Sequence, residues 1–248
     1  MSQLEDKKHM TEEDIKLKYI TPAITSKWNV SRISMETRIT DGKINLKGNF
    51  VFREKPRRAD YLLYLSANNP IAVVEAKDNT HSASFGLQQA MSYAKLLDLP
   101  FAYSSNGDSF VEHDFLTGTE REFPLDQFPT EEELIARCKA EQNGGAGLTR
   151  DQEIILDQPY YSSQNTWPPR YYQRIAVNRA VDAVARGQQR LLLVMATGTG
   201  KTYTAEILTI NPLCKFGSPP RIAEYFGGRD GYLKAVRELK LAIYGEVA

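Results

Sequence analysis

Residues 59–77 read ADYLLYLSANNPIAVVEAK, and this stretch decides the fold of the first half of the chain. Two apolar runs, 59–65 and 71–77, flank a polar turn and predict two neighbouring strands. Asp60 opens the first strand, and Glu75 and Lys77 close the second. Because strand residues two apart point to the same face, two carboxylates and an ammonium are expected around one point. Such a point suits a divalent cation and a phosphodiester.

This constellation predicts the chemistry of phosphodiester hydrolysis. Asp60, Glu75 and the Ala76 carbonyl would hold Mg²⁺, and Lys77 would orient the attacking water and steady the developing charge. Glu12, on the inward-facing stripe of the first predicted helix, would complete the site. A structural interpretation stands beside this one: Asp60 caps a turn, Glu75 pairs with a basic side chain, and Glu12 is ordinary first-turn charge.

The surrounding segments predict an α/β domain with a mixed sheet. Thr11 is expected to cap a helix over 11–20. The other predicted elements are strands 30–40 and 43–53 joined by a hairpin at Asp41-Gly42, a helix over 82–97, a strand at 100–103 and a strand beginning at Phe110-Val111.

Four polar residues flank the predicted metal site. Gln89 and Tyr93 lie four positions apart in the predicted helix, so they share one face and can hydrogen-bond a phosphate or a base. Arg57 and Arg58 precede the first strand and can hold the DNA backbone through its phosphates. A core tyrosine in an amphipathic helix and a solvated basic loop explain the same residues, and the sequence leaves both interpretations open.

A phosphate-binding loop is predicted in the second half of the chain. Residues 195–202 read MATGTGKT; the apolar run 191–194 before them predicts a buried strand, and helix signals begin at Lys201. In that context backbone N–H groups cradle the phosphates of ATP, Lys201 reaches the β- and γ-phosphates, and Thr202 binds Mg²⁺. The predicted ATP-binding residues of this loop are Thr197, Gly198, Thr199, Gly200, Lys201 and Thr202.

Gln173 lies in a helix predicted from Tyr171 to Arg186, upstream of this loop. Beside an aromatic residue, its amide is placed to read an adenine edge. Four segments follow from these patterns: a first domain at 1–140, a linker at 141–168, the start of an ATP-binding domain at 169–208 and a helical tail at 209–248.

Composition is that of an ordinary soluble globular chain. The formal net charge is zero, so contact with nucleic acid has to come from local basic patches. The N-terminus lacks an apolar signal region and no apolar run reaches the length of a membrane span, which favours the cytoplasm and no membrane partner. Cys138 and Cys214 lie far apart and form neither a metal-ligand pattern nor a disulfide framework.

Taken together, these motifs resemble the restriction subunit of type I restriction–modification enzymes over residues 11–205. Asp60, Glu75-Ala76-Lys77 and the pair Gln89 and Tyr93 are similar to a PD-(D/E)XK nuclease core, as is the run Ser104–Gly107. Gln173 and MATGTGKT resemble the opening of a superfamily 2 helicase motor. The resemblance implies a mixed-sheet nuclease followed by a partial P-loop motor segment. It also implies cleavage of double-stranded DNA with Mg²⁺ and ATP, and methyltransferase and specificity subunits as partners.

The chain departs from that family in its last segment. The 46 residues after Thr202 contain no apolar strand ending in Asp-Glu, which a motor needs for Mg²⁺ and water. A truncated or internally deleted subunit without translocation is therefore expected. Because the family couples cutting to translocation, the activity of the isolated chain stays open. Two alternatives remain: a non-catalytic DNA-binding or assembly module, and a stand-alone nucleotide-binding fragment.

Overall fold

The computed structural model describes residues 7–40, 44–47, 50–53, 55–66, 69–141, 149, 169–186, 188, 191–205 and 207–208. The chain divides into two compact units, Met1–Gly147 and Leu148–Ala248. The predicted hairpin turn at Asp41-Gly42, nearly all of the predicted linker and the tail at 209–248 lie outside the described residues. Every helix in the described part of the chain is too short or too polar to cross a membrane.

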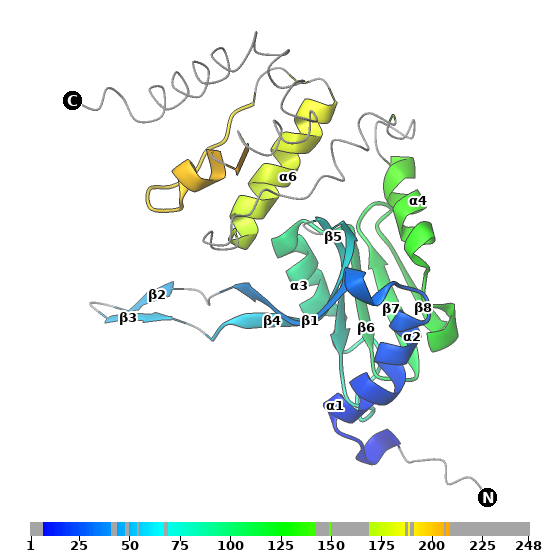
Figure 1. Ribbon diagram of the computed structural model, residues 1–248. Coiled ribbons are helices and arrows are strands. Elements are labelled where there is room, and N and C mark those ends of the chain that lie inside the picture. The colour runs from blue at the N-terminus through cyan, green and yellow to red at the C-terminus, as the bar shows by residue number, and fades with distance from the viewer. Residues whose placement is uncertain are drawn as a thin grey trace, which may run out of the picture. The chain divides into compact units, whose positions relative to one another are not determined.

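A six-stranded mixed sheet forms the centre of the first unit, as the sequence predicts (Figure 1). Its strand order is β1-β4-β5-β6-β7-β8, and only β5 and β6 run parallel. Helix α3 (Leu87–Leu97) makes the crossover that a parallel pair requires. The strands are β1 (Ile33–Thr40), β4 (Arg57–Ser66), β5 (Asn69–Ala76), β6 (Phe101–Ser105), β7 (Ser109–Asp114) and β8 (Thr119–Pro124).

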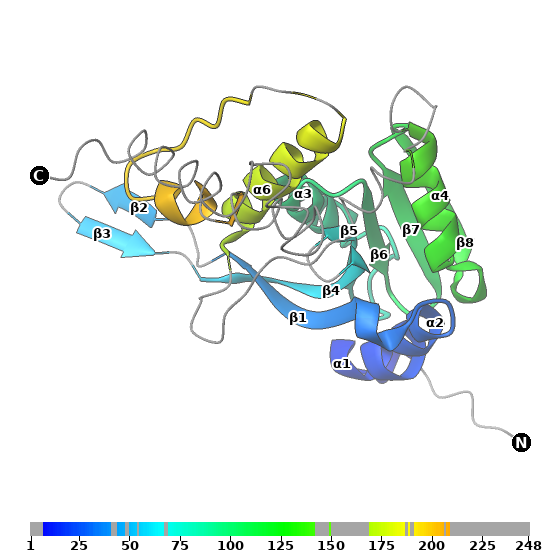
Figure 2. The ribbon, with the colours of Figure 1, turned by 45° about the horizontal axis from the view of Figure 1, so that its top comes forward.

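Strand β5 is buried from Pro70 to Ala76, because helices cover both faces of the sheet. Val74 faces a core shared with Ile15 and Ile20 of the N-terminal helices. On the other face α3 packs against β5 and β6 (Figure 2). Side chains alternate along a strand, so Glu75 points to the α3 face.

The N-terminal helix begins as predicted and continues further. Thr11 caps α1 (Glu12–Ile15) in a capping box with Asp14. A π-helical turn, η2 (Lys16–Ile20), follows, and α2 (Thr21–Thr25) continues the helix beyond its expected end. Pro22 lies in the first turn of α2, directly after the π-helical turn, and the chain remains helical there.

The predicted single strand over 43–53 is wrong. That segment forms two strands, β2 (Ile44–Lys47) and β3 (Phe50–Arg53), which pair with each other in a separate sheet. Strand β1 pairs with β4 instead, which places Ile33 opposite Leu63 and Met35 opposite Tyr61. These cross-strand apolar pairs explain the preference of β1 for β4.

Helix α4 (Glu131–Glu141) and the short helices η1 (Lys7–His9), η3 (Val30–Arg32) and η4 (Leu125–Gln127) were not expected from the sequence. A buried ion network fixes α4 to the sheet. Arg137 lies 2.8 Å from the Glu112 carboxylate and 2.5 Å from that of Asp114, both on β7. Because Glu112 and Asp114 are buried, the Arg137 guanidinium compensates part of the cost of removing their carboxylates from water.

In the second unit, helix α6 (Tyr171–Ala185) agrees with the prediction, and Val177 and Val181 pack against Ile207. Residues 201–205 are helical, also as predicted. The buried strand expected at 191–194 is wrong, because these residues have no strand conformation and Leu192 is 87% exposed. A strand needs neighbours for its N–H and C=O groups, and the described residues of this unit contain no other strand.

Candidate active site

Strands β4 and β5 bring the predicted acidic residues together. Tyr61 lies opposite Val74, so the antiparallel register sets Asp60 across from Glu75. The Ala76 N–H donates to Asp60 Oδ2 at 2.8 Å and fixes that carboxylate. Asp60 is the fourth residue of β4, which begins at Arg57, so the expectation that Asp60 opens the strand is corrected.

Lys77 follows β5 directly and joins this cluster. Its Nζ lies 3.9 Å from Glu75 Oε2 and 3.9 Å from Glu12 Oε2. Burial raises the pKa of Glu12, the Lys77 charge opposes that shift, and the Asp60 charge adds to it. Glu12, Asp60, Glu75 and Lys77 therefore interact electrostatically within one site.

Glu75 is the most constrained acid of the cluster. It is 1% exposed, and its Oε2 accepts a 2.6 Å hydrogen bond from Gln89 Nε2. Oε1 is buried with no hydrogen-bond partner. Burial, followed by the nearby charge of Asp60, raises the pKa of Glu75 to about 8. A buried carboxylate with an unpaired oxygen is unfavourable unless a cation or a proton compensates it.

Gln89 and Tyr93 connect α3 to this carboxylate. Gln89 Nε2 also lies 3.2 Å from Tyr93 Oη. The tyrosine ring is buried, and burial together with the Glu75 charge raises the pKa of its hydroxyl. The ring of Tyr93 is thus part of the core, as one interpretation of the sequence had it. Its hydroxyl group reaches the site, as the other interpretation requires.

The donor set fits a hard divalent cation. Two carboxylates and the Ala76 carbonyl are oxygen ligands of the kind Mg²⁺ prefers, and Mg²⁺ keeps several waters when it binds to few protein ligands. Among the described residues, no group of three or more acidic, imidazole or thiol side chains forms a metal site by itself. The unpaired Oε1 of Glu75 is the observation that favours a cation at this point.

Two residues that the sequence analysis missed shape the site. A Cβ on Gly86 would lie 2.6 Å from Ser104 Oγ and 3.3 Å from the Lys77 side chain, so only glycine leaves this space to Lys77. Lys16 is 2% exposed and lies 3.2 Å from Asp60 Oδ1. Its position on the inward side of the helix, between Ile15 and Ile20, was the available sequence signal.

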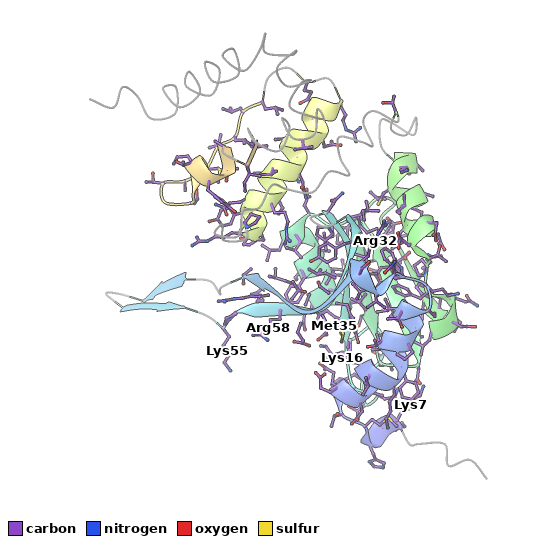
Figure 3. The ribbon with its side chains drawn as sticks, viewed as in Figure 1. Lys7, Lys16, Arg32, Met35, Lys55 and Arg58 are labelled. Atoms are coloured by element: carbon purple, nitrogen blue, oxygen red, sulfur yellow. The ribbon has the colours of Figure 1, made fainter. Side chains whose placement is uncertain are left out.

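Arg57 and Arg58 belong to β4 and are exposed, as is the neighbouring Lys55 (Figure 3). They lie on the same strand as Asp60, within three residues of it. Both arginines therefore lie in a strand, whereas the alternative that the sequence left open was a solvated loop. Their exposed guanidinium groups are accessible to a polyanion.

The phosphate loop of the second unit has the backbone that its glycines predict. Gly198 and Gly200 have φ angles of 77° and 78°, in the left-handed region where other residues are strained. Lys201 and Thr202 are exposed, and Lys201 Nζ donates to the Ala196 carbonyl at 3.2 Å. Thr197 is exposed, and Thr199 Oγ1 donates to the same carbonyl at 2.6 Å.

Gln173 is buried and engages this loop. Its Nε2 donates to the Thr199 carbonyl at 3.1 Å, and its Oε1 accepts from the Arg170 N–H at 2.8 Å. A Cβ on Gly200 would lie 2.4 Å from Gln173 Nε2, so the glycine also provides room for this amide. In this conformation both ends of the amide are bound within the chain.

The chain is similar in sequence to known restriction enzymes. The sequence profile described as "Type III restriction enzyme, res subunit" matches residues 166–221, which include Gln173 and the phosphate loop. The chain is 41% identical over 203 residues to the type I restriction enzyme EcoAI endonuclease subunit of Escherichia coli, covering 79% of this chain and 25% of that subunit. The EcoKI endonuclease subunit of E. coli strain K12 is 28% identical over 195 residues, covering 59% of this chain and 16% of that subunit.

A solved structure agrees. The fragment structure of a putative HsdR subunit of a type I restriction enzyme from Vibrio vulnificus YJ016 matches with a TM-score of 0.73 and 38% identity, over 84% of this chain and 39% of the other. The chain spans about a quarter of the EcoAI relative and less of the EcoKI one. Its mixed α/β fold agrees with this structure, and the chain is a homologue of type I restriction enzyme endonuclease subunits.

Proposed function

We propose that the first unit hydrolyses phosphodiester bonds of double-stranded DNA with Mg²⁺ as its cofactor. The observation that supports this most strongly is the joint placement of Asp60, Glu75 and Lys77, with Glu75 Oε1 buried and unpaired. A purely structural cluster would be expected to satisfy that oxygen. Two acids, an ammonium and an unsatisfied ligand position are the parts that metal-assisted hydrolysis needs.

Each side chain has a part in this proposal. Asp60, Glu75 and the Ala76 carbonyl hold the cation, which when bound polarises the phosphate and lowers the pKa of a water ligand. Lys77 orients the attacking water and stabilises the negative charge that develops on the phosphate. Gln89 holds Glu75 at a fixed angle through its 2.6 Å hydrogen bond.

Three remaining residues complete the assignment. Glu12, 3.9 Å from Lys77, limits the freedom of that ammonium and adds negative charge for the cation. Arg57 and Arg58 bind backbone phosphates of the duplex, since both are exposed on the strand that carries Asp60. These contacts position the DNA without reading its sequence.

A plasmid assay tests this function. Incubation of the chain with supercoiled plasmid and Mg²⁺ should convert it to the open-circular form, EDTA should stop the conversion, and added Mg²⁺ should restore it. Conversion that is insensitive to EDTA would identify a contaminant. The absence of any Mg²⁺-dependent nicking would favour the non-catalytic DNA-binding or assembly module instead.

We also propose that the second unit binds ATP through residues 197–202. The left-handed glycines and the exposed Lys201 and Thr202 support this, because they leave the loop's backbone and its cation accessible to phosphates. Gln173 stabilises the loop through its contact with Thr199.

Equilibrium binding of a fluorescent ATP analogue should show a loss of at least about tenfold in affinity for Lys201→Ala, since its ammonium contacts the β- and γ-phosphates. Lys139→Ala, in the first unit, serves as the matched control and should leave binding unchanged. Equal affinity of Lys201→Ala and wild type would contradict this assignment.

In the cell, we propose that the subunit of which this chain is a part works in the cytoplasm in a type I restriction complex. The homology to type I restriction enzyme subunits supports a methyltransferase subunit and a specificity subunit as its partners, with double-stranded DNA as the common substrate. The specificity subunit would select the DNA sequence, and cutting would be governed by ATP-driven translocation.

A further inference from the structure

Lys16 is a buried ammonium beside the proposed metal site. Its side chain is 2% exposed and belongs to the π-helical turn η2 of the N-terminal helix (Figure 3). The ammonium contacts Glu36 of β1 and Asp60 of β4. A lysine ammonium has three N–H donors. Three carboxylates lie within reach: Glu13 at 2.6 Å, Glu36 at 2.6 Å and Asp60 at 3.2 Å. The number of carboxylates equals the number of donors, so the cation is fully coordinated.

The β1–β4 register and the backbone conformation of Glu36 bring the Glu36 carboxylate to Lys16. The β1–β4 register places Met35 opposite Tyr61 and Thr37 opposite Ala59, so Glu36 lies across from Asp60. Glu36 has a φ of 50°, a left-handed conformation that is unfavourable for a glutamate inside a strand. Surrounding structure must compensate for it, and the 2.6 Å bond to Lys16 is the contact that its side chain gains.

Asp60 divides its two oxygens between two neighbours. Oδ1 faces the Lys16 ammonium, and Oδ2 accepts the Ala76 N–H on the side of Glu75. In two-metal sites, a pair of cations lies about 3.5–4 Å apart and clamps the two reacting oxygens. Asp60 and Glu75 would hold the first cation, and the Lys16 ammonium occupies the other side of the Asp60 carboxylate.

We infer that Lys16 substitutes for a second metal ion, so that this site holds a single divalent cation, between Asp60 and Glu75. This inference rests on the proposed Mg²⁺-dependent function. Without Lys16, the carboxylates of Glu13, Glu36 and Asp60 would gather around one point with no cation between them, and such a group of oxygen ligands attracts a divalent cation. The ammonium occupies that point, keeps a second ion out and holds Asp60 in place for the first.

Counting bound Mn²⁺ tests this inference, with Mn²⁺ as a probe for Mg²⁺ and the EPR signal of free Mn²⁺ as the readout. Wild type should bind one ion that Asp60→Asn removes. Lys16→Met, which keeps the length of the side chain but not its charge, should bind two such ions. Lys16→Met combined with Glu36→Gln should return to one. Lys18→Met, the loss of an exposed lysine on the same helix, should bind one ion like wild type.

The Mg²⁺ dependence of plasmid nicking provides a second readout that a merely structural lysine would not change. Lys16→Met should change the Hill slope from about one to about two and lower the maximal rate by about tenfold or more, because the second ion displaces Asp60. Thermal unfolding shows whether Lys16→Met folds. If it does not fold, the number of Mn²⁺ ions bound by wild type decides whether the site holds one ion or two.

The outcomes separate the two proposals. Two ions in wild type that depend on Asp60, or a single ion in folded Lys16→Met, would overturn the role of Lys16 and leave the nuclease assignment standing. No Asp60-dependent ion in wild type would overturn the metal site itself.

Discussion

Replacement of Lys77 by alanine should lower the rate of Mg²⁺-dependent plasmid nicking by about 10²–10³-fold, the usual effect of removing one group that stabilises transition-state charge. Lys77 Nζ lies 3.9 Å from carboxylate oxygens of both Glu75 and Glu12, so it is held at the edge of the proposed cation position. Metal binding should not weaken, because the variant removes a positive charge and no ligand.

Initial rates of conversion of supercoiled to open-circular plasmid measure this effect. Lys95→Ala is the matched control, since Lys95 is exposed in the last turn of α3 and lies outside the site. It should nick at the wild-type rate. If Lys77→Ala and wild type nicked equally, the activity would not come from this cluster.

Replacement of Glu75 by glutamine should abolish nicking and at the same time stabilise the metal-free protein at alkaline pH. The pKa of Glu75 is raised from 4.5 to about 8, mainly by burial. Between these two values the unfolded chain is ionised at this residue and the folded chain is protonated. The folded state thus binds more protons, and stability falls as pH rises across this window.

The size of this effect follows from the pKa difference. Each pKa unit corresponds to about 1.4 kcal/mol, and local relaxation reduces the full value, so the free energy of unfolding of wild type should fall by about 2–4 kcal/mol from pH 5 to pH 9 through this residue. Glu75→Gln has no charge to bury and should escape this loss, while Gln89 retains a hydrogen-bond acceptor.

Urea unfolding in EDTA at several pH values measures the difference between variant and wild type. The advantage of Glu75→Gln should grow from pH 5 to pH 9, whereas Glu132→Gln, at an exposed position of α4, should follow wild type. A difference that is constant with pH, or a Glu75→Gln variant less stable than wild type at pH 9, would show that Glu75 is an ordinary structural acid.

The sheet and the acidic pair were predictable because they depend on local patterns. Two apolar runs with a short polar turn give adjacent antiparallel strands. The length of the turn then sets which residues of the two strands lie opposite each other. Asp60 and Glu75 therefore meet as expected, and Gln89 reaches Glu75 because the crossover helix must cover the parallel strands.

Lys16 and Glu36 were not predictable in the same way. Lys16 is separated from Glu36 by 20 residues and from Asp60 by 44, and nothing in the sequence states that these segments pack together. A lysine in an apolar stripe is most often at the surface, with only its methylene groups covered. Only the tertiary structure shows that this one is buried among three acids.

The strand expected at 191–194 was predicted from the sequence but is not present in the structure. The run Leu191–Val194 has the composition of a buried parallel strand, but such a strand is stable only within a sheet. Leu192 and Val194 are exposed in the structure, and the described part of the second unit offers no strand to pair with them. The composition of residues 191–194 therefore predicted a strand, but without a neighbouring strand in the described residues the segment does not form one.

The start of helix α4 carries the sequence features of a helix N-terminus. Thr130 caps it, its Oγ1 accepting the Glu133 N–H at 3.2 Å, and three acids fill its first turn. Leu134 and Cys138 turn inward, and Arg137 binds Glu112 on β7.

Anomalous scattering from a Mn²⁺-soaked crystal of the chain would locate the proposed cation. We expect one peak in the first unit, with Asp60, Glu75 Oε1 and the Ala76 carbonyl at coordination distances of about 2.1–2.3 Å, and with the Lys16 ammonium still bound to Asp60. A crystal without a peak at these oxygens, or with Glu75 Oε1 turned away from every ion, would contradict it.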